Sequence, residues 1–141
     1  MNVREAIVLL LAGLAIWVLG TIYYANYGAS ILETAPARYW SAFAVSPLVS
    51  AALCAAILRW RHIVRQYWAP ALLLLALPGM IGEATLLSNF AAFMPGLKAA
   101  SAGPYGALLF ATYAFVLGIG TWATLSVPHS GSEQSGKAQP L

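Results

Sequence analysis

Four apolar segments, each long enough to cross a lipid bilayer, constrain this chain more than any other feature of its sequence. A helix rises ~1.5 Å per residue and the hydrocarbon core is ~30 Å thick, so one span needs about 20 mostly apolar residues. The segments run over residues 6–26, 40–58, 68–90 and 105–125. The sequence therefore predicts an all-α membrane protein, in which residues 1–125 form a bundle of four transmembrane helices with short loops.

The composition indicates that lipid replaces water around this chain. Its 141 residues are 61% hydrophobic and 8% charged, whereas about a quarter of the residues of an ordinary soluble domain are charged. The net charge of +3 would suit nucleic acid. The basic residues, however, stand mainly beside the apolar segments, where they are typical of signals for membrane topology. We therefore expect the lipid bilayer as partner and no nucleic acid.

The sequence lacks the residues that usually support metal, haem or redox chemistry. Cys54 is the only cysteine, which excludes an intrachain disulfide and a CxxC pair. His62 and His129 both lie outside the apolar segments, so no histidine pair could hold a haem between helices. We expect no cofactor and no metal. No nucleophile–base pair is recognisable either, so an enzyme ranks third among the functional classes.

The basic residues also predict an orientation. Arg59, Arg61 and Arg65 make the connection between the second and third segments the most basic in the chain. By the positive-inside rule, this loop and both termini lie in the cytoplasm. The arginines could instead bind anionic lipid headgroups, although such patches usually hold four to eight basic residues. Residues 126–141, rich in Ser, Gly and Gln, are predicted to form a disordered cytoplasmic tail.

Small residues mark the expected contacts between helices, because they let backbones approach closely in lipid. The second segment carries Ser46 and Ser50, and also Ala52 and Ala56, each pair spaced by four. This pattern predicts that the second helix lies at the centre of the bundle. The same pattern also fits a homodimer or a larger membrane complex. Pro78, inside the third segment, predicts a kink.

One carboxylate, Glu83, lies deep in the third segment, within the stretch PGMIGEATLLSNF. It is about four helical turns beyond Trp68, or ~22 Å, which places it in the outer third of the bilayer. An acid at this depth needs a partner or a proton. We therefore predict that the Glu83 carboxylate faces the interior of the bundle.

The outer end of the first segment and its loop, GTIYYANYGASILETAPARYW, offer partners for this acid. One hypothesis is a small outward-facing pocket that binds or transports a small cation or polar ligand. Its residues would be Glu83, Tyr23, Tyr24, Tyr27, Arg38 and Asn89. The alternatives are that Glu83 only stabilises the bundle and that the tyrosines form an aromatic belt at the membrane surface.

The layout of the four segments and the ETAPARYW loop, which opens the second segment, resemble uncharacterised bacterial four-helix membrane families known only as domains of unknown function. This resemblance covers all four spans. It implies a bacterial inner membrane and carries over no functional residues. Two functional classes therefore remain: a small transport or ligand-binding protein that uses Glu83, and a non-catalytic structural or assembly subunit of a larger membrane complex.

Reporter fusions test the predicted orientation. Fusions after Leu58 and after Leu125 should both report a cytoplasmic location, because the chain crosses the membrane an even number of times between its N-terminus and each fusion point. A fusion after Lys98 should report the opposite side and serves as the control. A periplasmic signal from either of the first two fusions would overturn the orientation.

Overall fold

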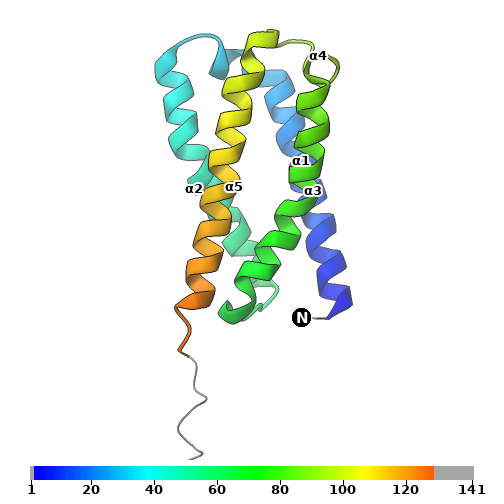
Figure 1. Cartoon of the computed structure of the whole chain (residues 1–141), viewed down its shortest axis with the longest axis vertical. Helices are drawn as coiled ribbons and strands as arrows, with labels where there is room; N and C mark the ends of the chain where they lie inside the picture. Colours follow the sequence, from blue (N-terminus) through cyan, green and yellow to red (C-terminus); the bar gives the residue numbers. More distant parts are fainter. Residues whose placement is uncertain (1, 129–141) are drawn as a thin grey trace, which may run out of the picture.

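The computed structural model describes residues 2–128, and most of them are helical. Four long helices run antiparallel along one another (Figure 1): α1 (Val3–Leu32), α2 (Pro36–Trp60), α3 (Trp68–Ser88) and α5 (Ala102–Leu125). The short elements η1 (Arg65–Tyr67), α4 (Phe90–Phe93) and η2 (Ala99–Ser101) lie between them. Each long helix lies in a candidate span that is long and apolar enough to cross a membrane. The predicted all-α bundle of four transmembrane helices is confirmed.

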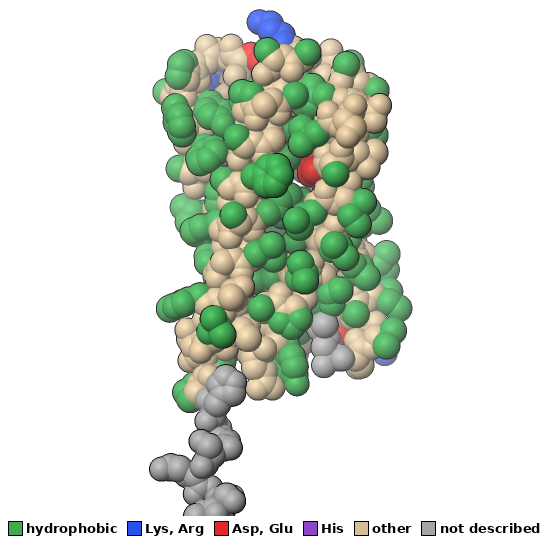
Figure 2. Space-filling model, in the orientation of Figure 1, with side chains coloured by type: hydrophobic (Ala, Val, Ile, Leu, Met, Phe, Trp, Pro, Cys, Tyr) green, Lys and Arg blue, Asp and Glu red, His purple; other side chains and the backbone are tan. Residues whose placement is uncertain are grey.

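Hydrophobic side chains cover the face of the bundle that Figure 2 shows, and basic side chains lie at its two ends. This distribution suits a protein whose middle is surrounded by lipid. The predicted disordered tail falls on residues 126–141, of which all but the first three lie outside the described residues. That part of the sequence interpretation therefore stays a prediction.

The first two helices are longer than the sequence pattern predicts. α1 continues to Leu32 instead of ending at residue 26, and α2 begins at Pro36 instead of Trp40. Pro36 suits this position because the first residue of a helix needs no N–H for a helical hydrogen bond. The polar stretch expected as a loop is therefore mostly helix, and the connection between α1 and α2 is very short.

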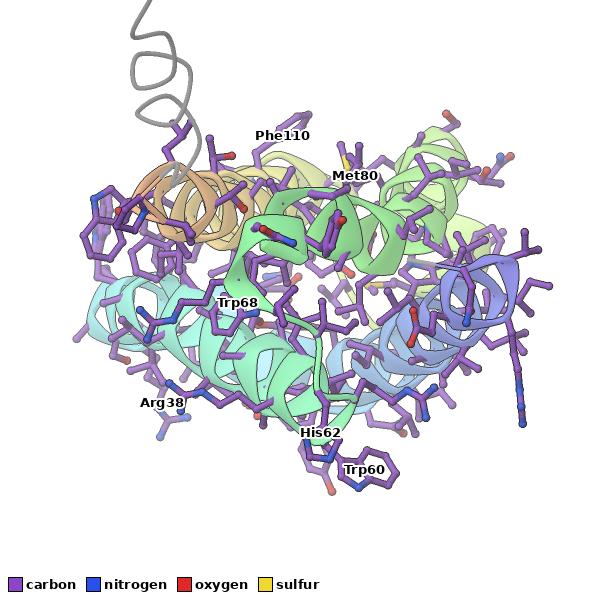
Figure 3. All side chains as sticks on the ribbon, turned by 90° about the horizontal axis from the view of Figure 1, so that it is seen from below. Arg38, Trp60, His62, Trp68, Met80 and Phe110 are labelled. Carbon is purple, nitrogen blue, oxygen red and sulfur yellow. The ribbon has the colours of Figure 1, made fainter. Side chains whose placement is uncertain are left out.

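Helix α3, and not α2, is the most buried of the four. It packs against both α1 and α5, and α5 packs in turn against α2, whereas α1 and α2 contact each other much less. Figure 3 shows this arrangement from below, with α3 and α5 on one side of the bundle and α1 and α2 on the other. Of the most apolar window in each span, 39% is buried for the third and 17% for the second. The prediction that α2 is central is wrong.

Glycines explain the central place of α3. At Gly13 of α1, an added Cβ would collide with the backbone carbonyl of Leu75 in α3, so the two helix backbones touch there. At Gly82 of α3, an added Cβ would collide with the indole ring of Trp17. Ala52 of α2, in contrast, is exposed. The small residues that bring helices together within this chain are therefore mainly those of α1 and α3.

Glu33 connects two segments at the end of the bundle that carries α4. Its Oε1 atom accepts hydrogen bonds from the Ser101 hydroxyl at 2.6 Å and from the Lys98 backbone amide at 2.7 Å. The bond from Ser101 lowers the pKa of the Glu33 carboxyl most, and the bond from the Lys98 amide lowers it further. The short connection after α1 is thus attached to the start of α5.

Replacing Glu33 with Gln should lower the melting temperature by a few degrees at neutral pH and weaken its pH dependence. Because the pKa of Glu33 is lower in the folded than in the unfolded protein, its stabilisation is complete above the unfolded pKa and is lost as pH falls through the folded pKa. Thermal unfolding in detergent, from neutral pH down through the carboxyl range, measures this. Lys98→Ala is the control, because the backbone amide that donates remains. Identical pH profiles for the wild type and Glu33→Gln would contradict this role.

Replacing Gly13 with Ala should destabilise the bundle by about 1–3 kcal/mol, because the new methyl group forces α1 and α3 apart. The matched control is Gly118→Ala in α5, where an added Cβ meets no atom within 4 Å and where Ala has the higher helix propensity. Thermal unfolding of both variants measures the difference. A Gly13→Ala protein as stable as the control would show that the backbones do not touch.

Candidate functional site

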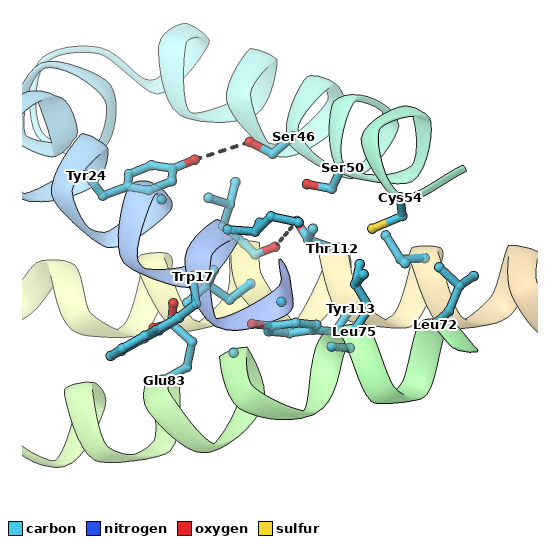
Figure 4. Close-up of a pocket in the computed structure, with 18 of the residues that line it drawn as sticks. Trp17, Tyr24, Ser46, Ser50, Cys54, Leu72, Leu75, Glu83, Thr112 and Tyr113 are labelled. Atoms are coloured by element: carbon cyan, nitrogen blue, oxygen red, sulfur yellow. Dashed lines mark hydrogen bonds between the residues drawn. The ribbon is translucent and has the colours of Figure 1, made fainter. Parts of the chain in front are cut away.

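The four long helices surround a cavity of about 170 Å³. An engineered protein cavity of about 150 Å³ binds benzene, so the space suits a ligand of about that size. Figure 4 shows the polar and aromatic side chains that line it among apolar ones. They come from all four helices: Trp17, Tyr24, Ser46, Ser50, Glu83, Tyr105, Thr112 and Tyr113.

Glu83 lies in the wall of this cavity and is only 7% exposed. The hydroxyl of Tyr105, from α5, donates a hydrogen bond to its Oε1 atom at 3.2 Å. The second oxygen, Oε2, is buried and has no hydrogen-bond partner among the described residues. The carboxylate therefore faces the interior of the bundle, as predicted, and keeps one free acceptor there.

Trp17 of α1 lies close to Glu83 in the same cavity wall (Figure 4). Its ring occupies the space next to Gly82, which precedes the acid in α3. The indole Nε1 atom is also buried without a hydrogen-bond partner among the described residues. A buried polar group without a partner costs ~1–3 kcal/mol. The unpaired donor and the unpaired acceptor lie in the same wall, where the Trp17 side chain is near enough to Glu83 to interact with its carboxylate.

Tyr24 extends the polar wall from α1 to α2. Its hydroxyl lies 3.2 Å from the hydroxyl of Ser46 (Figure 4). Its ring packs edge-on against that of Tyr105, with the centroids 5.3 Å apart. Because Tyr105 donates to Glu83, contacts run from α2 through α1 and α5 to the acid on α3.

The tyrosines predicted as ligand residues separate into two groups. Tyr24 lines the cavity, whereas Tyr23 and Tyr27 are 50% and 60% exposed. Residues 23 and 27 are one turn apart and share a face of α1, while residue 24 is turned by about 100°. Tyr24 instead shares the inward face with Trp17 and Gly20. Tyr23 and Tyr27 therefore lie on the outer face of α1, and the alternative interpretation, an aromatic belt, stays a prediction for them.

Arg38 and Asn89 lie away from the cavity. Arg38 is exposed in the first turn of α2 and donates from Nη1 to the carbonyl oxygen of Ser30 at 3.4 Å. Asn89 is exposed at the end of α3, and its side chain donates to the Thr85 carbonyl oxygen at 3.4 Å. The prediction that one of the residues Tyr23, Tyr24, Tyr27 and Arg38 would be the partner of Glu83 missed Tyr105. Because α1 extends beyond the depth of Glu83, Arg38 at the start of α2 lies at the end of the bundle.

Sequence reasoning also missed Trp17 and Tyr113 as parts of the cavity wall. Trp17 was the one tryptophan inside a predicted span, away from the membrane surface that indoles favour. Tyr105 and Tyr113 are two turns apart on one face of α5, with Leu109 between them. Either pattern could have pointed to a site opposite Glu83.

The cavity does not extend toward the end of the bundle that carries α4. Its wall reaches Tyr24, Glu83 and Tyr105 on that side. From Tyr105 toward α4 extends a buried cluster, here called the end cluster: Leu86, Phe90, Met94, Leu97 and Tyr105. The predicted outward-facing opening at this end is therefore filled by apolar side chains.

The model of a family of unknown function (DUF5367) matches residues 31–125. This match includes α2, α3 and α5, and with them Glu83 and Tyr105, while Trp17 and Tyr24 precede it. No match to a curated protein or to a solved structure was found. Because the match spans well over half of the sequence, the chain belongs to this family of unknown function, DUF5367.

Proposed function

We propose that this integral membrane protein binds a small organic cation in its central cavity, with the Glu83 carboxylate as counter-charge. The observation that carries the proposal is the buried Oε2 atom of Glu83, which lines the cavity and has no partner among the described residues. Acids within membrane-spanning helices commonly mark the sites of ions, protons or ligands.

A positive charge is the partner that this site lacks. An ionised carboxylate that is removed from water without a counter-charge costs several kcal/mol. Among the described residues, the basic side chains belong to the ends of the helices and their connections: Arg4, Arg38, Arg59, Arg61, Arg65 and Lys98. A ligand cation at Glu83 would supply the positive charge that none of these side chains supplies.

The aromatic lining supports an organic cation over a bare metal ion. The rings of Trp17, Tyr24, Tyr105 and Tyr113 line the same cavity as the acid. Aromatic faces attract organic ammonium groups through their quadrupoles, by about 2 kcal/mol or more where water is excluded. The volume of about 170 Å³ limits the buried part of such a ligand to roughly the size of a single ring.

The proposal includes a bacterial inner-membrane location with both termini in the cytoplasm. The start of α1, the connection that holds Arg59, Arg61 and Arg65, and the end of α5 lie at one end of the bundle (Figure 1). Arg4 belongs to the same end. This gathering of basic residues supports a cytoplasmic side there, and the role of the three arginines as topology signals stays a prediction.

The alternative function, a non-catalytic subunit of a larger membrane complex, has one observation in its favour. Ala52 and Ala56 are both exposed on α2 and lie one turn apart, which is the spacing that lets another helix approach closely. A homodimer would use the same face. The subunit role predicts that variants in the cavity change stability alone.

Benzylammonium, whose ring matches the cavity volume, is a suitable probe. It should raise the melting temperature of the purified protein with increasing concentration, because a ligand that binds only the folded state stabilises it. Glu83→Gln should keep its own melting temperature close to that of the wild type and lose this increase. Benzyl alcohol, a neutral analogue of similar shape, is the control ligand. No increase with benzylammonium, or an equal increase in Glu83→Gln, would contradict the proposal.

Gly20→Leu tests the place of binding without touching Glu83. Gly20 lies on the inward face of α1, lines the cavity, and an added Cβ would meet no atom within 4 Å. A leucine there should fill the cavity and abolish the response to benzylammonium while the protein stays folded. Gly118→Leu in α5, where a Cβ also meets nothing within 4 Å and which does not line the cavity, is the matched control. Binding that survives Gly20→Leu would place the site elsewhere.

A further inference from the structure

The four helices do not cover the cavity equally well. Every residue that α3 contributes to its lining is buried, whereas most of those from α1 and α2 are half-exposed. The half-exposed ones are Ile16, Trp17, Gly20 and Tyr24 in α1 and Ser46 and Ser50 in α2. Helix α5 contributes residues of both kinds, but it packs closely against both α2 and α3, while α1 and α2 contact each other much less. The cavity is therefore least covered between α1 and α2, here called the α1–α2 side.

Small residues explain why the α1–α2 side is poorly covered. Tyr24 and Ser46 share a hydrogen bond of 3.2 Å, which fixes how the two antiparallel helices are aligned. Gly20 precedes Tyr24 by four residues and Ser50 follows Ser46 by four, so both lie about one turn from this bond in the same direction. Both line the cavity, and an added Cβ at Gly20 would meet no atom within 4 Å. At this depth neither helix has a side chain long enough to close the space.

Apolar clusters block the cavity along the axis of the bundle. The end cluster fills the space toward α4. Toward the other end, Leu9, Leu58 and Trp68 belong to a second buried cluster and are at most 7% exposed. A molecule that travelled along the axis from either aqueous side would have to displace one of these clusters. The α1–α2 side avoids both.

The residues next to the α1–α2 side are suited to lipid. Tyr23 follows Gly20 by three residues and Leu53 follows Ser50 by three, so each lies about one turn further along its helix and beside the residue that lines the cavity. Their side chains are 50% and 46% exposed. A hydrocarbon chain that left the cavity between α1 and α2 would therefore contact large side chains on the lipid-facing surface.

We infer that the ligand is an ammonium ion with a hydrocarbon tail, which enters from the bilayer between α1 and α2 and binds with its charged group at Glu83 and its tail between these two helices. This inference rests on the proposed binding of an organic cation and adds the chemical class of the ligand and its route. A side that faces lipid admits molecules that partition into lipid. The cavity of about 170 Å³ has only to hold the charged group and the first few carbons.

A photoreactive ligand locates the tail directly. The probe is decylammonium with a diazirine at the end of its tail, illuminated with the full chain in nanodiscs of zwitterionic lipid. It should modify α1 and α2, with Tyr23 and Leu53 among the labelled residues found by mass spectrometry. An excess of decylammonium should suppress this labelling, whereas labelling by probe that is merely dissolved in the bilayer persists. If no labelling is suppressed, or if the suppressed labelling falls on the outer faces of α3 and α5, the inference is wrong.

A series of alkylammonium ions of increasing length tests whether the tail leaves the cavity. The probes are butyl-, hexyl-, octyl- and decylammonium, titrated against the protein in the same nanodiscs, with the rise in melting temperature as readout. If the tail leaves between α1 and α2, the affinity referred to the free ion in water should rise about threefold to fourfold for each added methylene. If the whole ligand must fit inside, affinity should fall once the chain exceeds about 170 Å³, and the route is contradicted.

Two variants of α2 separate a tail held between the helices from simple partitioning into lipid. Leu53→Trp should crowd the α1–α2 side and lower the affinity for decylammonium about tenfold, while butylammonium, which fits within the cavity, binds as before. Leu48→Trp is the matched control, because Leu48 is turned away from Leu53 by about 140° on the same helix, is 58% exposed and does not line the cavity. Equal effects of Leu53→Trp on both probes, or of both variants on decylammonium, would overturn the route.

The results also separate this inference from the proposed function. Butylammonium that binds in a Glu83-dependent way, combined with decylammonium that does not, would leave the cation site standing and remove the route between α1 and α2. If no member of the series binds in a Glu83-dependent way, both proposals fall. Glu83→Gln, measured with the photoreactive probe, should abolish the suppressible labelling, because the tail is held in place only when the ammonium group reaches the carboxylate.

Discussion

The contact between the backbones of α1 and α3, at Gly13 and Leu75, is the interaction on which the rest of this bundle depends. Lipid provides little hydrophobic drive between helices, so stability must come from close packing. With α1 and α3 this close, Trp17 fits against Gly82, and the next residue along α3, Glu83, faces inward. Helix α2 packs chiefly on α5 and contacts α1 much less. The cavity lies among the four helices, and residues of all four line it.

The fold could be predicted almost completely, because length and hydropathy alone decide how many helices cross a bilayer. Which helices pack most closely against one another could not be predicted. Small residues at a spacing of four indicate a close neighbour, but the same residues can line a cavity or meet lipid. In α2, Ser46 and Ser50 line the cavity, while Ala52 is exposed. Gly13, where α1 and α3 touch, has no small residue four positions away in the first segment, so the pattern did not mark it.

The candidate site could be predicted in part. The cost of turning an acid to lipid is enough to place Glu83 inside, and depth along a helix can be counted from the sequence. The face that a neighbouring helix presents at that depth cannot be counted in this way. The polar end of α1 lies at a suitable depth, yet of its three tyrosines only Tyr24 lines the cavity. The actual partner, Tyr105, belongs to α5, whose place beside α3 is a property of the tertiary structure.

Cys54 makes the cavity suitable for a labelling experiment, whatever the cavity binds. It is the only cysteine in the chain and lines the cavity from α2, on the same helix face as Ser46 and Ser50. A maleimide or nitroxide reagent that modifies the native sequence can therefore attach at one position alone, inside the bundle. The unmutated protein thus offers a single thiol for site-specific labelling, and the rate of labelling depends on how often a reagent reaches the interior of the bundle.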